Sequence, residues 1–300
     1  MSRKPLLSAI KEKTLLADGA MGTELAEQGV AVGGIGDEFC LSHPEKVSAV
    51  HRAYVEASAD ILLTNTFQAS PPALSRHGLS DKSYAINLAA ARLARDAMGP
   101  AGYVLGDVGP FGGFLEPLGT MNATELEQAF HVQVTGLLDG GVDGIVIETM
   151  TALEEIEVVC AAVRTARLHV PIVASLTFDR VADGGFRTMT GSSVQDVIRF
   201  LTQLDVDILG CNCGTGLTVD DYVQLVQEYR AESKLPIMVQ PNAGQPRLDR
   251  GTIIYDETPE KMAAAVPALL RAGATIIGGC CGTTPNHIRL FREQLENHTT

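Results

Sequence analysis

The sequence predicts a single (β/α)8 barrel, in which eight parallel strands form a closed sheet and eight helices surround it. Short apolar runs rich in Val, Ile and Leu recur eight times within 300 residues, and a segment with the apolar spacing of an α-helix follows each run. Near-continuous apolar strands are typical of a parallel sheet that is covered on both faces. Because this length is usual for one such barrel, we predict one domain over residues 1–300.

The predicted strands are bounded by Gly, Asp, Asn or Pro residues, which interrupt apolar runs. In chain order they span residues 14–18, 60–65, 103–108, 143–148, 171–177, 205–210, 236–240 and 274–279. The predicted helices lie between them, at about residues 44–58, 81–98, 123–139, 152–167, 192–204, 218–231, 258–271 and 284–296. Thr258-Pro259 and Thr284-Pro285 each place a capping hydroxyl before a proline at the first helical position. A doubly wound open sheet is the alternative, but no G-x-G-x-x-G sequence follows the first strand.

The chain is acidic, with 23 Lys and Arg residues, 36 Asp and Glu residues and a formal net charge of −13. Such a chain lacks the basic surface that binds nucleic acid, and anionic membranes would repel it. No apolar run approaches the roughly 18 residues of a membrane span, and the first residues lack the long apolar core of a signal peptide. We therefore expect a cytoplasmic protein with no nucleic-acid partner and no membrane partner.

Four of the six cysteines form two close pairs, which in a reducing compartment indicates metal or redox chemistry. Cys211 and Cys213 follow the sixth predicted strand, and Cys280 and Cys281 follow the eighth. The active site of such a barrel lies at these carboxyl ends, and a catalytic zinc ion takes three protein ligands with one open position. Adjacent cysteines share an ion only where the chain bends, which the neighbouring glycines permit. Spacing does not choose between Cys211 and Cys213, and small buried residues are the alternative interpretation.

Two carboxylates also end apolar strands, Asp18 and Glu148. They could act as an acid/base pair or bind a substrate ammonium group, whereas a loop-stabilising role is the structural alternative, above all for Asp18. The Gly-rich turn from Gly19 to Thr23 opens a helix, and its N–H groups suit a carboxylate. Asp107 is interpreted as structural. No lysine ends a strand, which excludes a Schiff-base aldolase of the barrel type.

Five motifs occur in order along the chain: D-G-A-M-G-T-E-L at 18–25, T-N-T-F at 64–67, N-C-G at 212–214, P-N-A-G at 241–244 and G-G-C-C-G-T-T-P at 278–285. In these motifs the chain resembles the homocysteine S-methyltransferase family, and most of all the homocysteine-binding domain of cobalamin-dependent methionine synthase. The resemblance covers nearly the whole chain, and G-G-C-C-G-T-T-P with N-C upstream is its most specific part. The barrel fold of that family agrees with the strand pattern.

The resemblance implies a role for several residues. Zinc should be held by Cys213, Cys280 and Cys281, with Cys211 as a neighbour rather than a ligand. Asp18 and Glu148 should bind the homocysteine ammonium group, and the turn after Asp18 should receive its carboxylate. The full set of substrate-binding residues expected on this basis is Asp18, Gly19, Ala20, Thr23, Asn65, Glu148 and Asn242. Of these, Asn242 is expected near the metal, at the open position when substrate is absent.

The expected reaction is attack of a zinc-activated homocysteine thiolate on a methyl donor, which gives methionine. The donor is expected to be methylcobalamin on a separate corrinoid protein, or S-methylmethionine. Betaine is less favoured, because the chain contains no tryptophan, the best residue for a cation cage. The alternatives are methyl transfer to another small thiol, a redox sensor with a Cys280–Cys281 disulfide, and a non-catalytic module that binds zinc or homocysteine.

Overall fold

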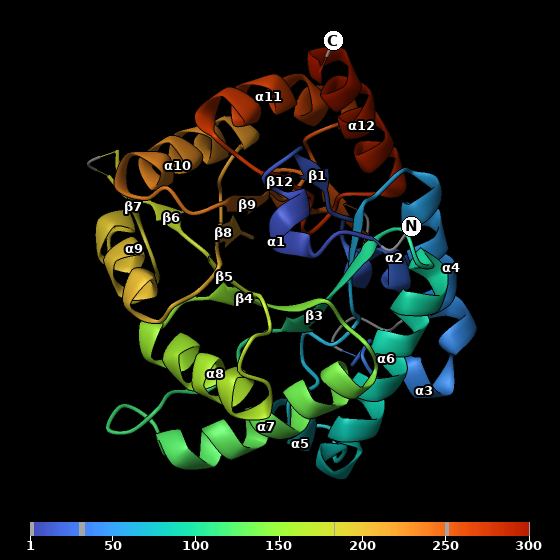
Figure 1. Cartoon of the computed structure of the whole chain (residues 1–300), viewed down its shortest axis with the longest axis vertical. Helices are drawn as coiled ribbons and strands as arrows, with labels where there is room; N and C mark the ends of the chain where they lie inside the picture. Colours follow the sequence, from blue (N-terminus) through green and yellow to red (C-terminus); the bar gives the residue numbers. More distant parts are fainter. Residues whose placement is uncertain (1–2, 30–33, 183, 250–251, 300) are drawn as a thin grey trace.

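The computed structural model describes residues 3–29, 34–182, 184–249 and 252–299. Its main sheet has the strand order β1-β12-β9-β8-β5-β4-β3-β2, and all neighbouring pairs are parallel. A parallel bridge between Ala17 and Ile61 joins the two edges, so the sheet closes into a barrel (Figure 1). The predicted (β/α)8 barrel is confirmed. The strands are β1 (Leu15–Leu16), β2 (Ile61–Leu63), β3 (Tyr103–Val108), β4 (Gly144–Met150), β5 (Ile172–Leu176), β8 (Ile208–Asn212), β9 (Ile237–Gln240) and β12 (Ile276–Ile277).

All eight predicted helices are present around the barrel (Figure 1). They are α4 (Pro44–Glu56), α6 (Ser83–Met98), α7 (Ala123–Asp139), α8 (Leu153–Ala166), α9 (Val194–Gln203), α10 (Val219–Glu232), α11 (Pro259–Ala272) and α12 (Pro285–Thr299). The capping role of Thr258 is confirmed, because its hydroxyl accepts a hydrogen bond from the Lys261 N–H and Pro259 begins the helix. No helix within the described ranges is long and apolar enough to cross a membrane.

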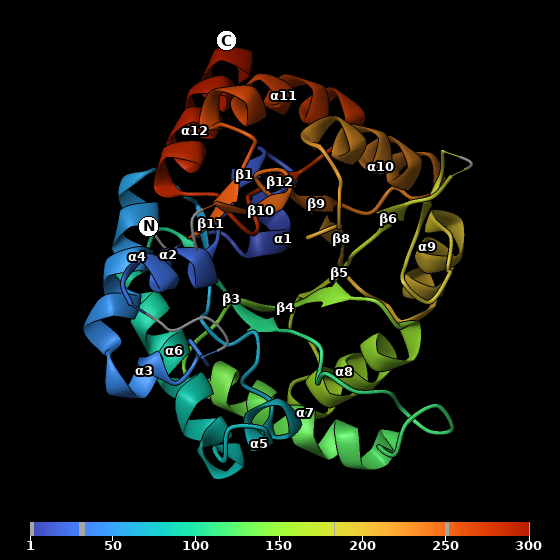
Figure 2. The same ribbon diagram turned by 180° about the vertical axis from the view of Figure 1, so that it is seen from behind.

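Several short elements were not resolved from the sequence, because each is too short for a hydrophobic period to emerge. They are α1 (Leu6–Ala9), α2 (Met21–Glu27), α3 (Phe39–Ser42), α5 (Pro71–Ser75), the 3-10 helix η1 (Ser80–Lys82), and the hairpins β6 (Asp179–Arg180) with β7 (Phe186–Arg187) and β10 (Pro246–Asp249) with β11 (Thr252–Tyr255). Of these, only α2 had a partial prediction, from the Gly-rich turn that opens it. In the view of Figure 2, the β10–β11 hairpin is seen over the barrel.

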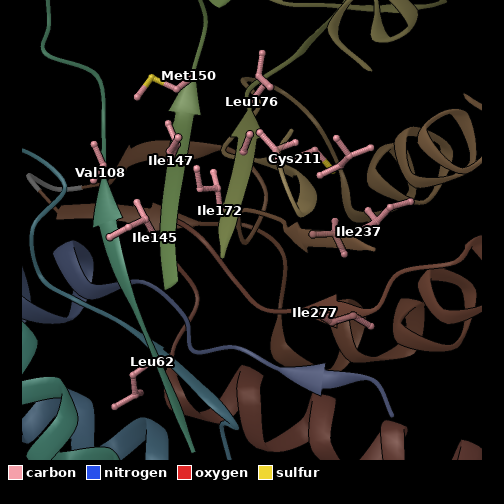
Figure 3. Close-up of a cluster of buried hydrophobic side chains, with 14 of the residues drawn as sticks. Leu62, Val108, Ile145, Ile147, Met150, Ile172, Leu176, Cys211, Ile237 and Ile277 are labelled. Atoms are coloured by element: carbon pink, nitrogen blue, oxygen red, sulfur yellow. The ribbon is translucent and has the colours of Figure 1, made fainter. Parts of the chain in front are cut away.

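Two apolar layers hold the barrel together. One lies inside it and contains Ile61, Leu105, Val146 and Ile208, together with residues of α1, which covers the near end of the barrel in Figure 1. The larger layer lies between the strands and the outer helices, and Figure 3 shows part of it. Because side chains alternate along a strand, every second strand residue contributes to each layer. This alternation also decides which polar residues reach the inside at the carboxyl ends of the strands.

Candidate metal and substrate site

Three thiols meet at the carboxyl ends of β8 and β12. The Sγ atom of Cys281 lies 3.8 Å from that of Cys213 and 4.0 Å from that of Cys280, and all three sulfurs lie within 4.8 Å of one another. The three residues are half-buried. Hydrogen bonds from the two neighbouring thiols hold the pKa of the Cys281 thiol well below its usual value. The cluster therefore already favours one thiolate.

The spacing of the sulfurs fits a metal better than a disulfide. A disulfide bond is about 2.05 Å long, so no pair in the cluster is bonded. Tetrahedral zinc with Zn–S bonds of about 2.3 Å would place its sulfur ligands about 3.8 Å apart. The observed distances of 3.8 and 4.0 Å match this geometry. Three soft thiols in one cluster are also a donor set that suits zinc.

The backbone at the end of β8 separates Cys213 from Cys211. Cys211 points outward, where it packs between the barrel and the helices beside Leu176 (Figure 3). In a continuing strand Cys213 would share that face. Instead, Cys213 adopts a left-handed conformation with φ 52°, which turns the chain after Asn212. The structure thus places Cys213 in the cluster and Cys211 outside it, which spacing alone could not decide.

Glycines shape the loop that carries Cys280 and Cys281. A side chain on Gly279 would collide with Thr283, and Gly282 has φ 79° beneath the ring of Tyr255. The Thr283 hydroxyl donates a 2.7 Å hydrogen bond to the Cys280 carbonyl and accepts one from the Ala20 N–H. The predicted bend is therefore present, and it ties the cysteine loop to the turn after β1.

A cavity of about 420 Å³ lies beside the thiol cluster. Residues from the ends of seven barrel strands line it, and none of these residues is Lys, Arg or His. The lining residues are Asp18, Gly19, Ala20, Met21, Gly22, Thr23, Gly36, Asp37, Leu63, Thr64, Asn65, Thr66, Phe67, Gln68, Asp107, Glu148, Thr149, Cys213, Gln240, Gly279, Cys280 and Cys281. Thiols and carboxylates thus share one cavity that offers no cationic side chain.

Both predicted carboxylates face this cavity. Asp18 is buried, and its Oδ2 accepts a 2.9 Å hydrogen bond from the Leu63 N–H. Burial, and then repulsion from Glu148, raise the pKa of Asp18 well above its usual value. Burial raises the pKa of Glu148 to about 8, and the Cys281 thiolate adds to this shift. Such carboxyl groups are favourable in their ionised form only beside a cation, so the cavity suits a positively charged ligand group.

The turn after Asp18 provides hydrogen-bond donors that suit a negatively charged ligand group. Gly19 to Thr23 line the cavity where α2 begins, and no side chain caps this helix at Ala20. Uncapped N–H groups at a helix start attract anions. The Thr23 hydroxyl is buried without a hydrogen-bond partner among the described residues. This wall of the cavity can therefore bind a carboxylate.

The two predicted asparagines differ in position. Asn65 lines the cavity, and its Nδ2 donates a 2.8 Å hydrogen bond to the Gly36 carbonyl. Asn242 is buried but does not line the cavity, and its Nδ2 donates to the Gly214 carbonyl at 3.4 Å. The Oδ1 of Asn242 has no partner in the described part of the chain. Asn242 thus lies beside the loop of Cys213 and does not line the cavity.

Two cavity carboxylates were not among the predicted site residues, Asp107 and Asp37. Asp107 lies near the end of β3 and Glu148 near the end of β4. Each lies two residues beyond an inward-facing apolar residue, Leu105 and Val146 respectively, and so faces the cavity. This spacing was visible in the sequence. Asp37 lies in the loop between α2 and α3, where no sequence period indicates which way a side chain points.

Asp37→Asn is expected to stabilise the protein at neutral pH. Burial raises the pKa of Asp37 from 3.8 to about 6, so the folded chain holds a proton that the unfolded chain releases between these values. Stability therefore falls as the pH rises through this window, by up to about 3 kcal/mol. The asparagine oxygen can still accept the hydrogen bond from the Gln68 N–H. Urea unfolding should show no difference between variant and wild type near pH 3.5 and a stabilised variant at pH 7, and a difference independent of pH would contradict this.

The chain is similar in sequence and in structure to known proteins. A sequence model of the homocysteine S-methyltransferase family matches residues 15–295. Two methionine synthases are similar to the chain over 95% of its length: that of Mycobacterium leprae is 30% identical, and that of Mycobacterium tuberculosis is 31% identical. The chain spans about a quarter of their length, 24% and 25% respectively.

A solved structure of similar size also matches. The metallated form of the homocysteine methyltransferase MmuM from Escherichia coli superimposes with a TM-score of 0.80 and 26% identity, over 97% of this chain and 100% of that one. Its apo form gives a TM-score of 0.74. The family match covers nearly the whole barrel, including all strands that carry the thiols and the carboxylates. The chain belongs to the homocysteine S-methyltransferase family.

Proposed function

We propose that this chain transfers a methyl group to the sulfur of homocysteine, with a zinc ion held by Cys213, Cys280 and Cys281. The observation that carries the proposal is one cavity that joins these three thiols to buried carboxylates without a counter-charge. An amino acid with a thiol has a group that complements each: its ammonium group pairs with the carboxylates, and its sulfur can bind the metal that the three thiols hold. The metallated form of the E. coli homocysteine methyltransferase supports a metal at such a site.

Zinc, when bound, favours the thiolate form of a coordinated substrate thiol, which is the nucleophilic form. The chain's own groups bind and orient the rest of the substrate. Asp18 and Glu148 accept hydrogen bonds from the ammonium group, and the turn from Gly19 to Thr23 donates to the carboxylate. The ammonium and carboxylate groups on the α-carbon are then both fixed, which directs the sulfur at the other end of the molecule to the three cysteines. Such positioning lowers the entropic part of the barrier.

Two methyl donors are proposed, methylcobalamin on a separate corrinoid protein and S-methylmethionine. The similarity to the two methionine synthases supports methionine as the product with either donor. The match to the E. coli homocysteine methyltransferase supports homocysteine as the acceptor with either donor. We also propose that residues 1–300 form one domain and that the protein works in the cytoplasm, where its free thiols stay reduced.

Methionine formation by zinc-loaded, reduced protein tests the proposal. Homocysteine is supplied with methylcobalamin, S-methylmethionine or betaine in separate reactions, and methionine is quantified. Turnover with the first or second donor supports the proposal and selects the donor. If calorimetry shows that the zinc-loaded protein binds no homocysteine, the assignment of homocysteine as the acceptor is wrong. Binding without turnover with any donor would instead indicate a non-catalytic module or a protein-bound corrinoid donor, which adding a methylated corrinoid protein distinguishes.

A further inference from the structure

We propose that Asp107 is a third acceptor for the substrate ammonium group and makes the cavity selective for a primary amine. This inference rests on the proposed function and adds a specificity residue to it. Asp107 is the residue before the last in β3, and its side chain follows those of Tyr103 and Leu105 on the inner face of the barrel. It lines the same cavity as Asp18 and Glu148.

The backbone of Asp107 is held in place while its carboxylate is left free. The Asp107 N–H donates a 2.9 Å hydrogen bond to the Thr64 hydroxyl, and its carbonyl accepts one of 2.7 Å from the Thr66 hydroxyl. The side chain is only 5% exposed, yet its Oδ1 has no partner within the described residues. A buried oxygen without a partner costs stability. A fixed and unpartnered acceptor of this kind is what a binding site requires.

The charges around Asp107 favour a cation. Burial is the main cause that raises the pKa of Asp107 well above its usual value, and Glu148, Asp37 and Asp18 add repulsion in that order. No lining residue of the cavity carries a positive charge. A second polar oxygen, Oε1 of Gln240, is also buried at the cavity wall without a partner. A positively charged donor would satisfy these groups together.

The number of acceptors matches a primary ammonium group. Such a group carries three N–H donors. One oxygen of Asp18 already accepts a hydrogen bond from the Leu63 N–H, whereas the side chain of Glu148 makes no hydrogen bond or ion pair among the described residues. One hydrogen bond to Asp18 and one to Glu148 leave the third N–H donor of the ammonium group for another carboxylate. Asp107 supplies the third acceptor, so a ligand that lacks one N–H donor should lose a hydrogen bond to this residue.

Calorimetric binding to the zinc-loaded protein, without a methyl donor, tests this assignment. The ligands are homocysteine and 4-sulfanylbutanoate, which is homocysteine without its amino group. Asp107→Asn should weaken homocysteine binding at least about tenfold and leave 4-sulfanylbutanoate binding unchanged or tighter, because one charge-assisted hydrogen bond is lost. Asp139→Asn is the matched control: it removes the same charge from an exposed residue at the end of α7 and should change neither affinity.

Unchanged homocysteine affinity in the Asp107→Asn variant would overturn the assignment, and so would equal losses for both ligands. If wild-type protein binds neither thiol, the proposed function itself fails. A second measurement needs no variant, should Asp107→Asn not fold. Wild-type protein should bind N,N-dimethylhomocysteine, which keeps one N–H donor, at least about tenfold more weakly than homocysteine. Equal affinities for the two would overturn the assignment.

Discussion

Cys281→Ser is expected to lose tight zinc binding and methyl transfer while keeping the barrel. The Cys281 sulfur lies 3.8 and 4.0 Å from the other two sulfurs of the cluster, whereas a serine hydroxyl stays protonated and is a poor zinc ligand. Protein zinc sites gain roughly 10–16 kcal/mol from about four ligands, so one lost thiolate should weaken binding by roughly several hundredfold. Competition with a chromogenic chelator measures the affinity, and methionine formation measures the activity.

Cys211→Ala is the control for this experiment. Cys211 is only two residues from Cys213, but it packs between the barrel and the helices and has no place in the cluster. The variant should keep its zinc affinity and its activity and lose about 1 kcal/mol of stability, because a buried side chain is truncated. Wild-type zinc affinity in Cys281→Ser, or loss of zinc in Cys211→Ala, would show that the ligands are assigned wrongly.

The sequence was sufficient for the barrel because its signal is repeated. Each of the eight strands carries its own apolar run and each of the eight helices its own apolar period, and the predicted limits of α7 agree with the observed Ala123–Asp139. The predicted strand ends differ from the observed ones where the backbone leaves the regular strand conformation. The fourth strand continues beyond Glu148 to Met150, because Thr149 adopts φ 58° and the pairing register shifts there. Such a bulge depends on tertiary contacts, which no local pattern records.

The sequence predicted those residues of the site that lie at or just after the ends of the barrel strands. Cys213, Cys280 and Cys281 lie together, and six of the seven predicted substrate residues line the cavity, with Asn242 outside it. The choice of Cys213 over Cys211 required either the family resemblance or the left-handed backbone at Cys213. Asp107 was interpreted as structural, although the two-residue spacing after Leu105 places it on the inner face. A count of alternation along β3 would have identified it.

Glu148→Gln is expected to weaken homocysteine binding by roughly 30-fold to 4,000-fold, since removing one charge of a buried pair costs about 2–5 kcal/mol. The same substitution should stabilise the ligand-free protein at pH 8. Burial raises the pKa of Glu148 from 4.5 to about 8, so between these values the folded chain binds a proton that the unfolded chain has lost, and stability falls as the pH rises.

Glu155→Gln separates the two effects of that substitution. Glu155 is also buried, its pKa is raised by burial to about 7, and its Oε1 accepts a hydrogen bond from the Phe111 N–H, but it does not line the substrate cavity. Both variants should therefore gain stability at pH 8 in urea unfolding, whereas only Glu148→Gln should lose affinity for homocysteine in calorimetry. Equal affinities of Glu148→Gln and wild type would mean that the ammonium group binds elsewhere, because a buried carboxylate that pairs with it cannot be neutralised without loss.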